Sequence, residues 1–170
     1  MITSNTQFNR EKKKIVLQRQ IEVTENAMCG YMVMWEALYA LKSVMERFSI
    51  NPTPAQLELL QRAIDGVSHF QEKTFGHMKA IQLYYNCSSI AEDFQTAEID
   101  KVLLDLSDVI SRTFVRMDQL RTDGDPNGLM QVEFEHITNT YHLYAQAIDC
   151  KMKSIQATQE YLRKEFKKLK

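Results

Sequence analysis

Oxygen-rich side chains in the segment 123–128 could hold a calcium ion. The segment reads Asp-Gly-Asp-Pro-Asn-Gly, which places oxygen ligands at positions 1, 3 and 5 of a calcium loop and a glycine at position 6. Position 12 of such a loop is normally a bidentate glutamate, and here it is Phe134, flanked by Glu133 and Glu135. The same residue types also form tight turns between helices. The sequence favours the turn, with a calcium site as the alternative.

A second metal-binding pattern is the pair Glu133 and His136, whose spacing places both side chains on one face of a helix. Ferritin-like two-metal bundles need two such pairs and a glutamate from each of two further helices. The chain supplies one pair, because neither His69 nor His77 has a glutamate three residues before it. We therefore predict no metal site and no cofactor.

Glu36 is a candidate acid, because it is the only charged side chain between Tyr31 and Leu41. Acid–base catalysis would need a second group beside it, and the spacing of the sequence places none there. The sequence also has no Gly-x-Ser-x-Gly motif and no phosphate-binding glycine loop. We expect Glu36 to be hydrogen-bonded within the fold or exposed to solvent. We predict no catalytic residue, no enzymatic activity and no small-molecule substrate.

Basic side chains are concentrated at both ends of the chain, and a fold that brings the ends together would form a basic tip. The predicted anion-binding residues are Arg10, Lys12, Lys13, Lys14, Arg163, Lys164, Lys167 and Lys168. Such a tip could bind the phosphates of nucleic acid or of anionic lipid. The alternative is a solvated tip, because acidic residues between 92 and 100 can neutralise it and lysines suit a helix C-terminus.

The segment 28–45 is apolar around almost its whole circumference. A surface helix keeps a polar face, so a helix of this kind is surrounded by neighbours or covered by a partner. The nine methionines of the chain can serve as core filler or as an adaptable binding face. The predicted partner-binding residues are Tyr31, Met32, Trp35, Glu36 and Tyr39. The partner would be a second copy of the chain or a helix of another protein.

Four helices are predicted to position these residues, at about 8–48, 54–85, 90–121 and 128–168. Thr53 and Pro54 form an N-cap and first-turn signal for the second helix. The third helix carries an inward series with alternating steps of four and three residues, with a possible break near 95–96. This series is Ile99, Leu103, Leu106, Ile110, Thr113, Met117 and Leu120.

The predicted fold is all-α: an elongated, antiparallel up-down-up-down four-helix bundle with long helices and short loops, forming one domain over residues 1–170. The low content of glycine (5) and proline (3) supports long helices, and short loops make consecutive helices antiparallel. Both termini would then lie at one end. Coiled-coil-like packing is expected along the inward series.

The composition of the chain limits the functional classes to which the protein can belong. The net charge of −1 gives no overall preference for nucleic acid. The three scattered cysteines form no disulfide framework, and the sequence has no secretory signal or membrane-spanning run. We expect a cytoplasmic, non-enzymatic interaction protein (a scaffold, adaptor or regulator) that self-associates through the first helix. The alternatives are binding of nucleic acid or anionic membrane at the basic tip, and a small-ligand or metal-binding bundle with Glu36, Glu133 and His136 inside.

Overall fold

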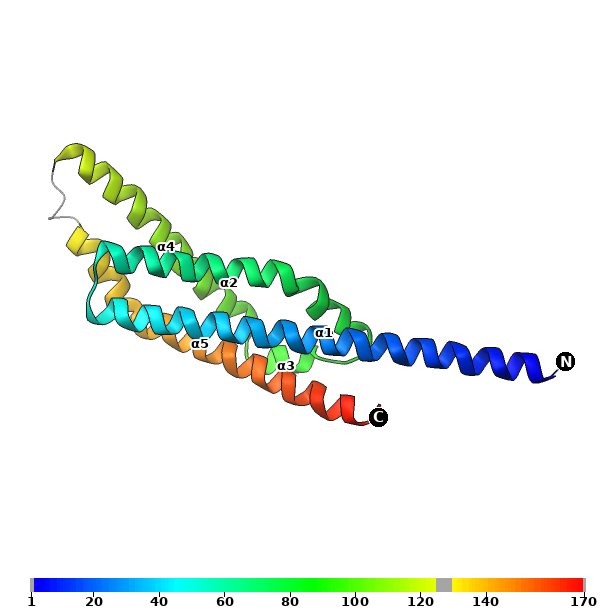
Figure 1. The fold of residues 1–170 in the computed structure, drawn as a ribbon. Helices are drawn as coiled ribbons and strands as arrows, with labels where there is room; N and C mark the ends of the chain where they lie inside the picture. Colours follow the sequence, from blue (N-terminus) through cyan, green and yellow to red (C-terminus); the bar gives the residue numbers. More distant parts are fainter. Residues whose placement is uncertain (1, 125–129, 170) are drawn as a thin grey trace.

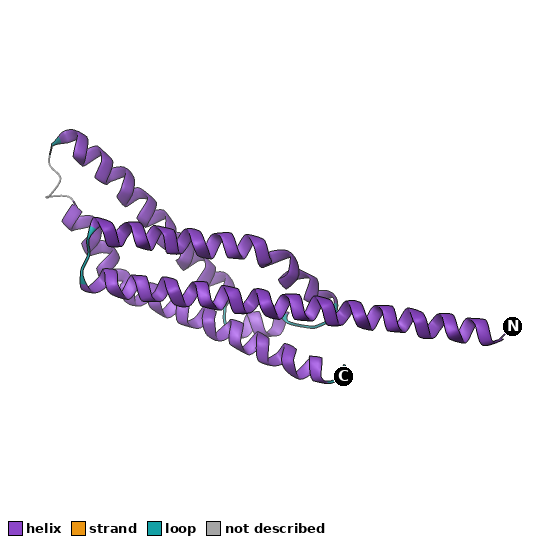
Figure 2. Ribbon diagram, viewed as in Figure 1, coloured by secondary structure: helices purple, strands orange, loops and turns teal. Residues whose placement is uncertain are grey.

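The computed structural model describes residues 2–124 and 130–169, and these residues form helices joined by short connections (Figure 1). No strand occurs in these two ranges (Figure 2), which confirms the predicted all-α class. The elements are α1 (Ile2–Ile50), α2 (Pro54–Ala80), the 3-10 helix η1 (Ile81–Leu83), α3 (Ser88–Asp93), α4 (Thr96–Asp123) and α5 (Met130–Lys167). None of the helices within these ranges combines the length and hydropathy needed to cross a bilayer.

The turn between α1 and α2 follows from local chemistry. Pro52 disfavours helical conformation at the residue before it, and α1 ends at Ile50. The Oγ1 atom of Thr53 accepts a hydrogen bond from the Gln56 amide at 3.2 Å, which satisfies one of the free donors of the first turn. Pro54 then occupies the first helical position, where its missing amide proton costs nothing.

Consecutive long helices run in opposite directions, as the colours in Figure 1 show. α1 packs along α2 and α5, and α4 packs mainly against α5. α4 makes few contacts with α2 and diverges from it towards the end of the molecule that holds the α4–α5 connection. The N-terminal part of α1 projects beyond all the other helices.

The third predicted helix is split in two. α3 ends at Asp93, and Gln95 adopts a left-handed conformation with φ of 48° before α4 begins at Thr96. Such a conformation stops a right-handed helix and is unfavourable for a residue with a Cβ atom. It redirects the chain, so that α4 starts in a new direction. The second predicted helix also ends earlier than 85, because η1 replaces its last turn after Ala80.

The inward series of α4 is confirmed at six of its seven positions. Ile99, Leu106, Ile110, Thr113, Met117 and Leu120 are buried, while Leu103 is only partly buried. On α5 the same spacing buries Phe134, Ile137, Tyr144 and Ile148. Phe134 meets Phe48 of α1 in an edge-to-face ring contact with centroids 5.4 Å apart. The residue at the twelfth position of the suggested calcium loop is therefore a core residue.

Apolar side chains are exposed on both α1 and α2. Leu17 is exposed because no other described helix covers the first turns of α1. Phe75 is also exposed, and its neighbour Thr74 is buried instead. A Cβ atom at Gly30 would lie 3.1 Å from the Cβ of Thr74, so the missing side chain of Gly30 lets α1 and α2 approach closely here.

Candidate interaction surface

The outer face of α1 exposes apolar side chains in the middle of the molecule. Met32 is 50% exposed and Tyr39 is 58% exposed, and Glu36 between them is also exposed. The ring of Tyr39 stacks on that of Trp35, with centroids 5.5 Å apart and an angle of 7° between the planes. The stack holds the exposed Tyr39 ring in one orientation, which lowers the entropy cost of using it in a contact.

A groove between α1 and α5 continues this surface. It has a volume of about 480 Å³, and α1 contributes Met32, Trp35 and Glu36 to it. The α5 side contributes Gln156, Gln159, Glu160 and Arg163. The groove thus combines two apolar side chains, Met32 and Trp35, with polar groups and charges of both signs. This is the mixture found where a protein partner binds, with an apolar centre and a polar rim.

Two of the five predicted partner-binding residues face the interior more than the surface. Trp35 and Tyr31 are partly buried and pack against the main hydrophobic core. Burial raises the pKa of the Tyr31 hydroxyl to about 12, with a smaller contribution from the Cys87 thiol. Tyr31 is therefore not part of the candidate surface. This surface consists of the α5 residues of the groove together with Met32, Trp35, Glu36 and Tyr39.

The indole Nε1 of Trp35 is buried and has no hydrogen-bond acceptor among the described residues. A buried donor without an acceptor is unfavourable by about 1–3 kcal/mol. The Trp35 ring lies at the edge of the groove, between the core and the exposed Tyr39.

The two basic stretches lie at the same end of the molecule but do not meet as expected. Arg10, Lys12, Lys13 and Lys14 are exposed on the part of α1 that projects past the end of α5 (Figure 1). The exposed basic residues at the other end of the chain are Arg163, Lys164 and Lys167 at the C-terminus of α5 and Lys168 directly after it. The separation arises because α1 begins several turns beyond the point where α5 stops. The structure thus has two basic segments in place of one tip.

Part of the charge on α5 is compensated within the chain. Lys168 forms an ion pair with Glu165 at 2.5 Å, which raises the pKa of the Lys168 ammonium group. Arg163 shares its groove with the carboxylates of Glu36 and Glu160. Asp100, an acidic residue expected near the tip, instead pairs with Lys151 at 2.8 Å. The projecting segment of α1 is the less compensated of the two basic segments.

The metal and acid candidates do not converge. Glu36 and His136 are both exposed, on different helices, so these two residues do not lie inside the bundle as the alternative of a metal-binding bundle requires. Within the described ranges, no three potential metal ligands cluster. The side chain of Glu133 and most of the 123–128 segment lie outside the described residues. Gly124, which is described, ends α4 in a left-handed conformation with φ of 80°, as a helix-terminating glycine does.

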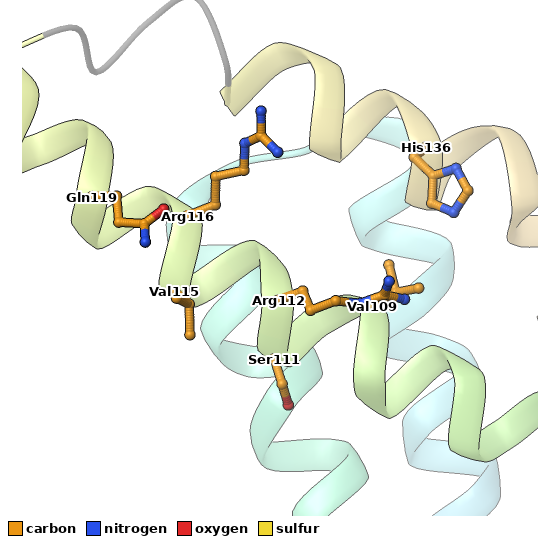
Figure 3. A pocket seen from close by; sticks show the side chains of 7 residues that line it. All are labelled: Val109, Ser111, Arg112, Val115, Arg116, Gln119 and His136. Carbon is orange, nitrogen blue, oxygen red and sulfur yellow. The ribbon is translucent and has the colours of Figure 1, made fainter.

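His136 instead lines a surface pocket of about 610 Å³ between α4 and α5 (Figure 3). The other lining residues all come from α4 and include the two arginines Arg112 and Arg116. Arginines and a histidine on a wide, open surface suit transient contact with anions, but the pocket holds no pair of groups arranged for acid–base chemistry.

A cavity between α2 and α4 is marked by no sequence motif. It has a volume of about 150 Å³ and is lined by residues of α1, α2, α4 and α5, together with Gln82 of η1, Cys87, and Ser88 at the start of α3. A second cavity of about 240 Å³ adjoins it along α2 and α4. The two share four lining residues: Val67, Gln71, Asp100 and Leu103.

The chain matches no family model, no curated protein and no solved structure.

Proposed function

We propose that the protein is a non-enzymatic interaction protein that self-associates through the outer face of α1. The observation that carries the proposal is the exposed apolar surface at Met32 and Tyr39, which continues into the groove between α1 and α5. Aromatic side chains and methionine are enriched in the cores of protein interfaces. The same groove has charges of both signs at its edge, which suits an interface between two identical surfaces.

The projecting segment of α1 supports the same proposal. Residues 7–19 are all exposed, and four of them are apolar; these are Phe8, Ile15, Val16 and Leu17. In proteins most of the stability of a helix comes from packing against other elements, and this segment of α1 packs against no other element that the structure describes. A partner helix lying along this segment would stabilise it and cover its apolar side chains.

The proposal includes an architecture and a location. We propose that α1, α2, α4 and α5 form an elongated up-down-up-down bundle of one domain, with α3 as an insertion in the connection between α2 and α4. We also propose that the protein resides in the cytoplasm. Cys29, Cys87 and Cys150 are all free thiols, which suits a reducing compartment.

Self-association is tested by measuring the molar mass in sedimentation across a range of protein concentrations. We expect a dimer or larger oligomer. The double variant Met32→Glu/Tyr39→Glu should weaken its assembly at least tenfold, because it places two carboxylates of like charge in an apolar interface. The matched control Leu104→Glu/Leu143→Glu changes two similarly exposed apolar residues on α4 and α5 and should leave assembly unchanged. A wild-type protein that stays monomeric at high concentration would contradict the proposal.

A second candidate function, binding of phosphates on nucleic acid or anionic lipid, is favoured by the projecting basic segment. Arg10 and Lys12 to Lys14 are exposed there, with Glu11 as the neighbouring acid. Lysines around the whole circumference of a helix favour attraction to phosphates over insertion of one apolar face into a membrane.

The triple variant Lys12→Glu/Lys13→Glu/Lys14→Glu tests this function. If the segment binds phosphates, affinity for a short DNA duplex or for phosphatidylserine vesicles should fall at least a hundredfold in the variant. In the wild type the affinity should decrease steeply with salt. The control Lys73→Glu/Lys79→Glu/Lys101→Glu changes the net charge equally at exposed positions on α2 and α4. Equal loss in both triple variants would mean that net charge, and not this segment, determines binding.

A further inference from the structure

The adjoining cavities between α2 and α4 arise from the way the chain turns into α4. α4 contacts α2 at few points, and it starts in a new direction after the left-handed Gln95. Leu103 is the one member of the α4 inward series that is not buried, and it lines both cavities. The core is therefore incompletely filled at this level, although side chains of four long helices surround it.

The walls combine two kinds of surface. The inner wall of the smaller cavity is apolar and includes Met34, Leu38 and Ile155. Uncharged hydrogen-bonding side chains, among them Gln71 and Thr96, lie elsewhere on its lining. An apolar wall with a few polar groups is the usual composition of a small-molecule site.

The charged groups of the lining neutralise each other. Lys151 donates a hydrogen bond to Asp100 at 2.8 Å, and both residues line the smaller cavity. An anionic ligand would have to displace Asp100 from Lys151 or lie beside the Asp100 carboxylate, which repels it. A cationic ligand would meet the same difficulty at the Lys151 ammonium group. The lining thus favours a neutral ligand over either ion.

We propose that these cavities bind a neutral, mainly alkyl molecule that carries one hydrogen-bonding group, such as a medium-chain alcohol. A dry cavity of about 150 Å³ accommodates one benzene molecule, and the second, larger cavity extends the space along α2 and α4. The alkyl chain contacts Leu38, Val67 and Leu103, and the hydroxyl group contacts the polar part of the lining. This site goes beyond the proposed interaction surface and does not depend on it.

Calorimetric titration of the full chain with 1-octanol tests the proposal, with octanoate and octylammonium as charged analogues of the same length. We expect saturable binding of 1-octanol, at least tenfold tighter than that of either ion, and a rise in the melting temperature in its presence. No saturable binding of 1-octanol up to its solubility limit would overturn the proposal. Equal binding of all three compounds would overturn the preference for a neutral ligand.

Two substitutions locate the site. Val67→Phe adds bulk at a residue shared by both cavities and should weaken 1-octanol binding at least tenfold. Leu59→Phe adds a ring to the same helix at an exposed position and should leave binding unchanged. Because overpacking can impair folding, Leu103→Phe provides a second test from the opposite wall, where the residue is only partly buried. Folded Val67→Phe and Leu103→Phe variants that bind 1-octanol like the wild type would place binding elsewhere and overturn the assignment.

Discussion

Leu106→Ala should lower the free energy of unfolding by about 3 kcal/mol, within the range of 2–5 kcal/mol that buried leucines show on truncation. Leu106 is fully buried, with 0% of its surface exposed, and belongs to the main core cluster. Removing its side chain loses the transfer energy of the removed carbons and leaves a cavity that the surrounding core residues cannot readily fill. For a chain of this length, 3 kcal/mol corresponds to a fall in melting temperature of roughly 6–12 °C.

Urea denaturation followed by circular dichroism measures this effect. Leu104→Ala is the matched control, because Leu104 is the same residue type on the same helix and is 64% exposed. The control should change the free energy of unfolding by no more than about 0.5 kcal/mol. Similar losses in the two variants would mean that the inward face of α4 is assigned incorrectly. That result would also remove the basis for placing Leu103 beside a cavity.

The inward face of α4 was predictable because its apolar residues follow one stripe. Steps of four and three from Ile99 to Leu120 leave the remaining positions largely polar, so only one orientation buries the stripe. The inward face of α1 could not be predicted in the same way. Its middle segment is apolar all round, and hydrophobic patterning cannot select between Met34, which is buried, and Met32, which is half exposed.

Contacts between helices also override the pattern. Phe75 is more hydrophobic than Thr74, and the sequence favours burying it. The absence of a side chain at Gly30 creates a close approach that fits Thr74 and leaves Phe75 outside. Thr74 is satisfied there because its hydroxyl donates to the carbonyl of Phe70 at 2.6 Å. Glycine in a helix predicts a weak point from the sequence, but its packing partner depends on the fold.

The candidate surface was partly predictable and the cavities were not. The α1 part of the surface could be predicted because it lies in an apolar segment that contains a single charged residue. Its members are Met32, Trp35, Glu36 and Tyr39. Their groove partners on α5 are ordinary polar residues, such as Gln156 and Gln159, that only the helix pairing identifies. The cavities depend on the direction in which α4 leaves Gln95, and no local propensity encodes that angle.

Tyr31 should make the stability of the protein fall in alkaline solution. Its hydroxyl is neutral below pH 10 in both states. Burial raises its pKa from 10.0 to about 12 in the folded protein, so the unfolded chain loses this proton first as pH rises. The free energy of unfolding is therefore unaffected by Tyr31 below pH 10 and declines between pH 10 and 12. A difference of about two units corresponds to a loss of roughly 3 kcal/mol.

Other groups also titrate in this range, so the prediction rests on a comparison of variants. Lys42 has a raised pKa because it donates a hydrogen bond to Asp149, and its loss of charge also destabilises the fold at high pH. Tyr31→Phe removes only the tyrosine contribution, and its free energy of unfolding should fall by roughly 3 kcal/mol less than that of the wild type between pH 9 and 12. Parallel curves for Tyr31→Phe and the wild type would show that Tyr31 is accessible to water, and the wall it forms at the smaller cavity would then be open.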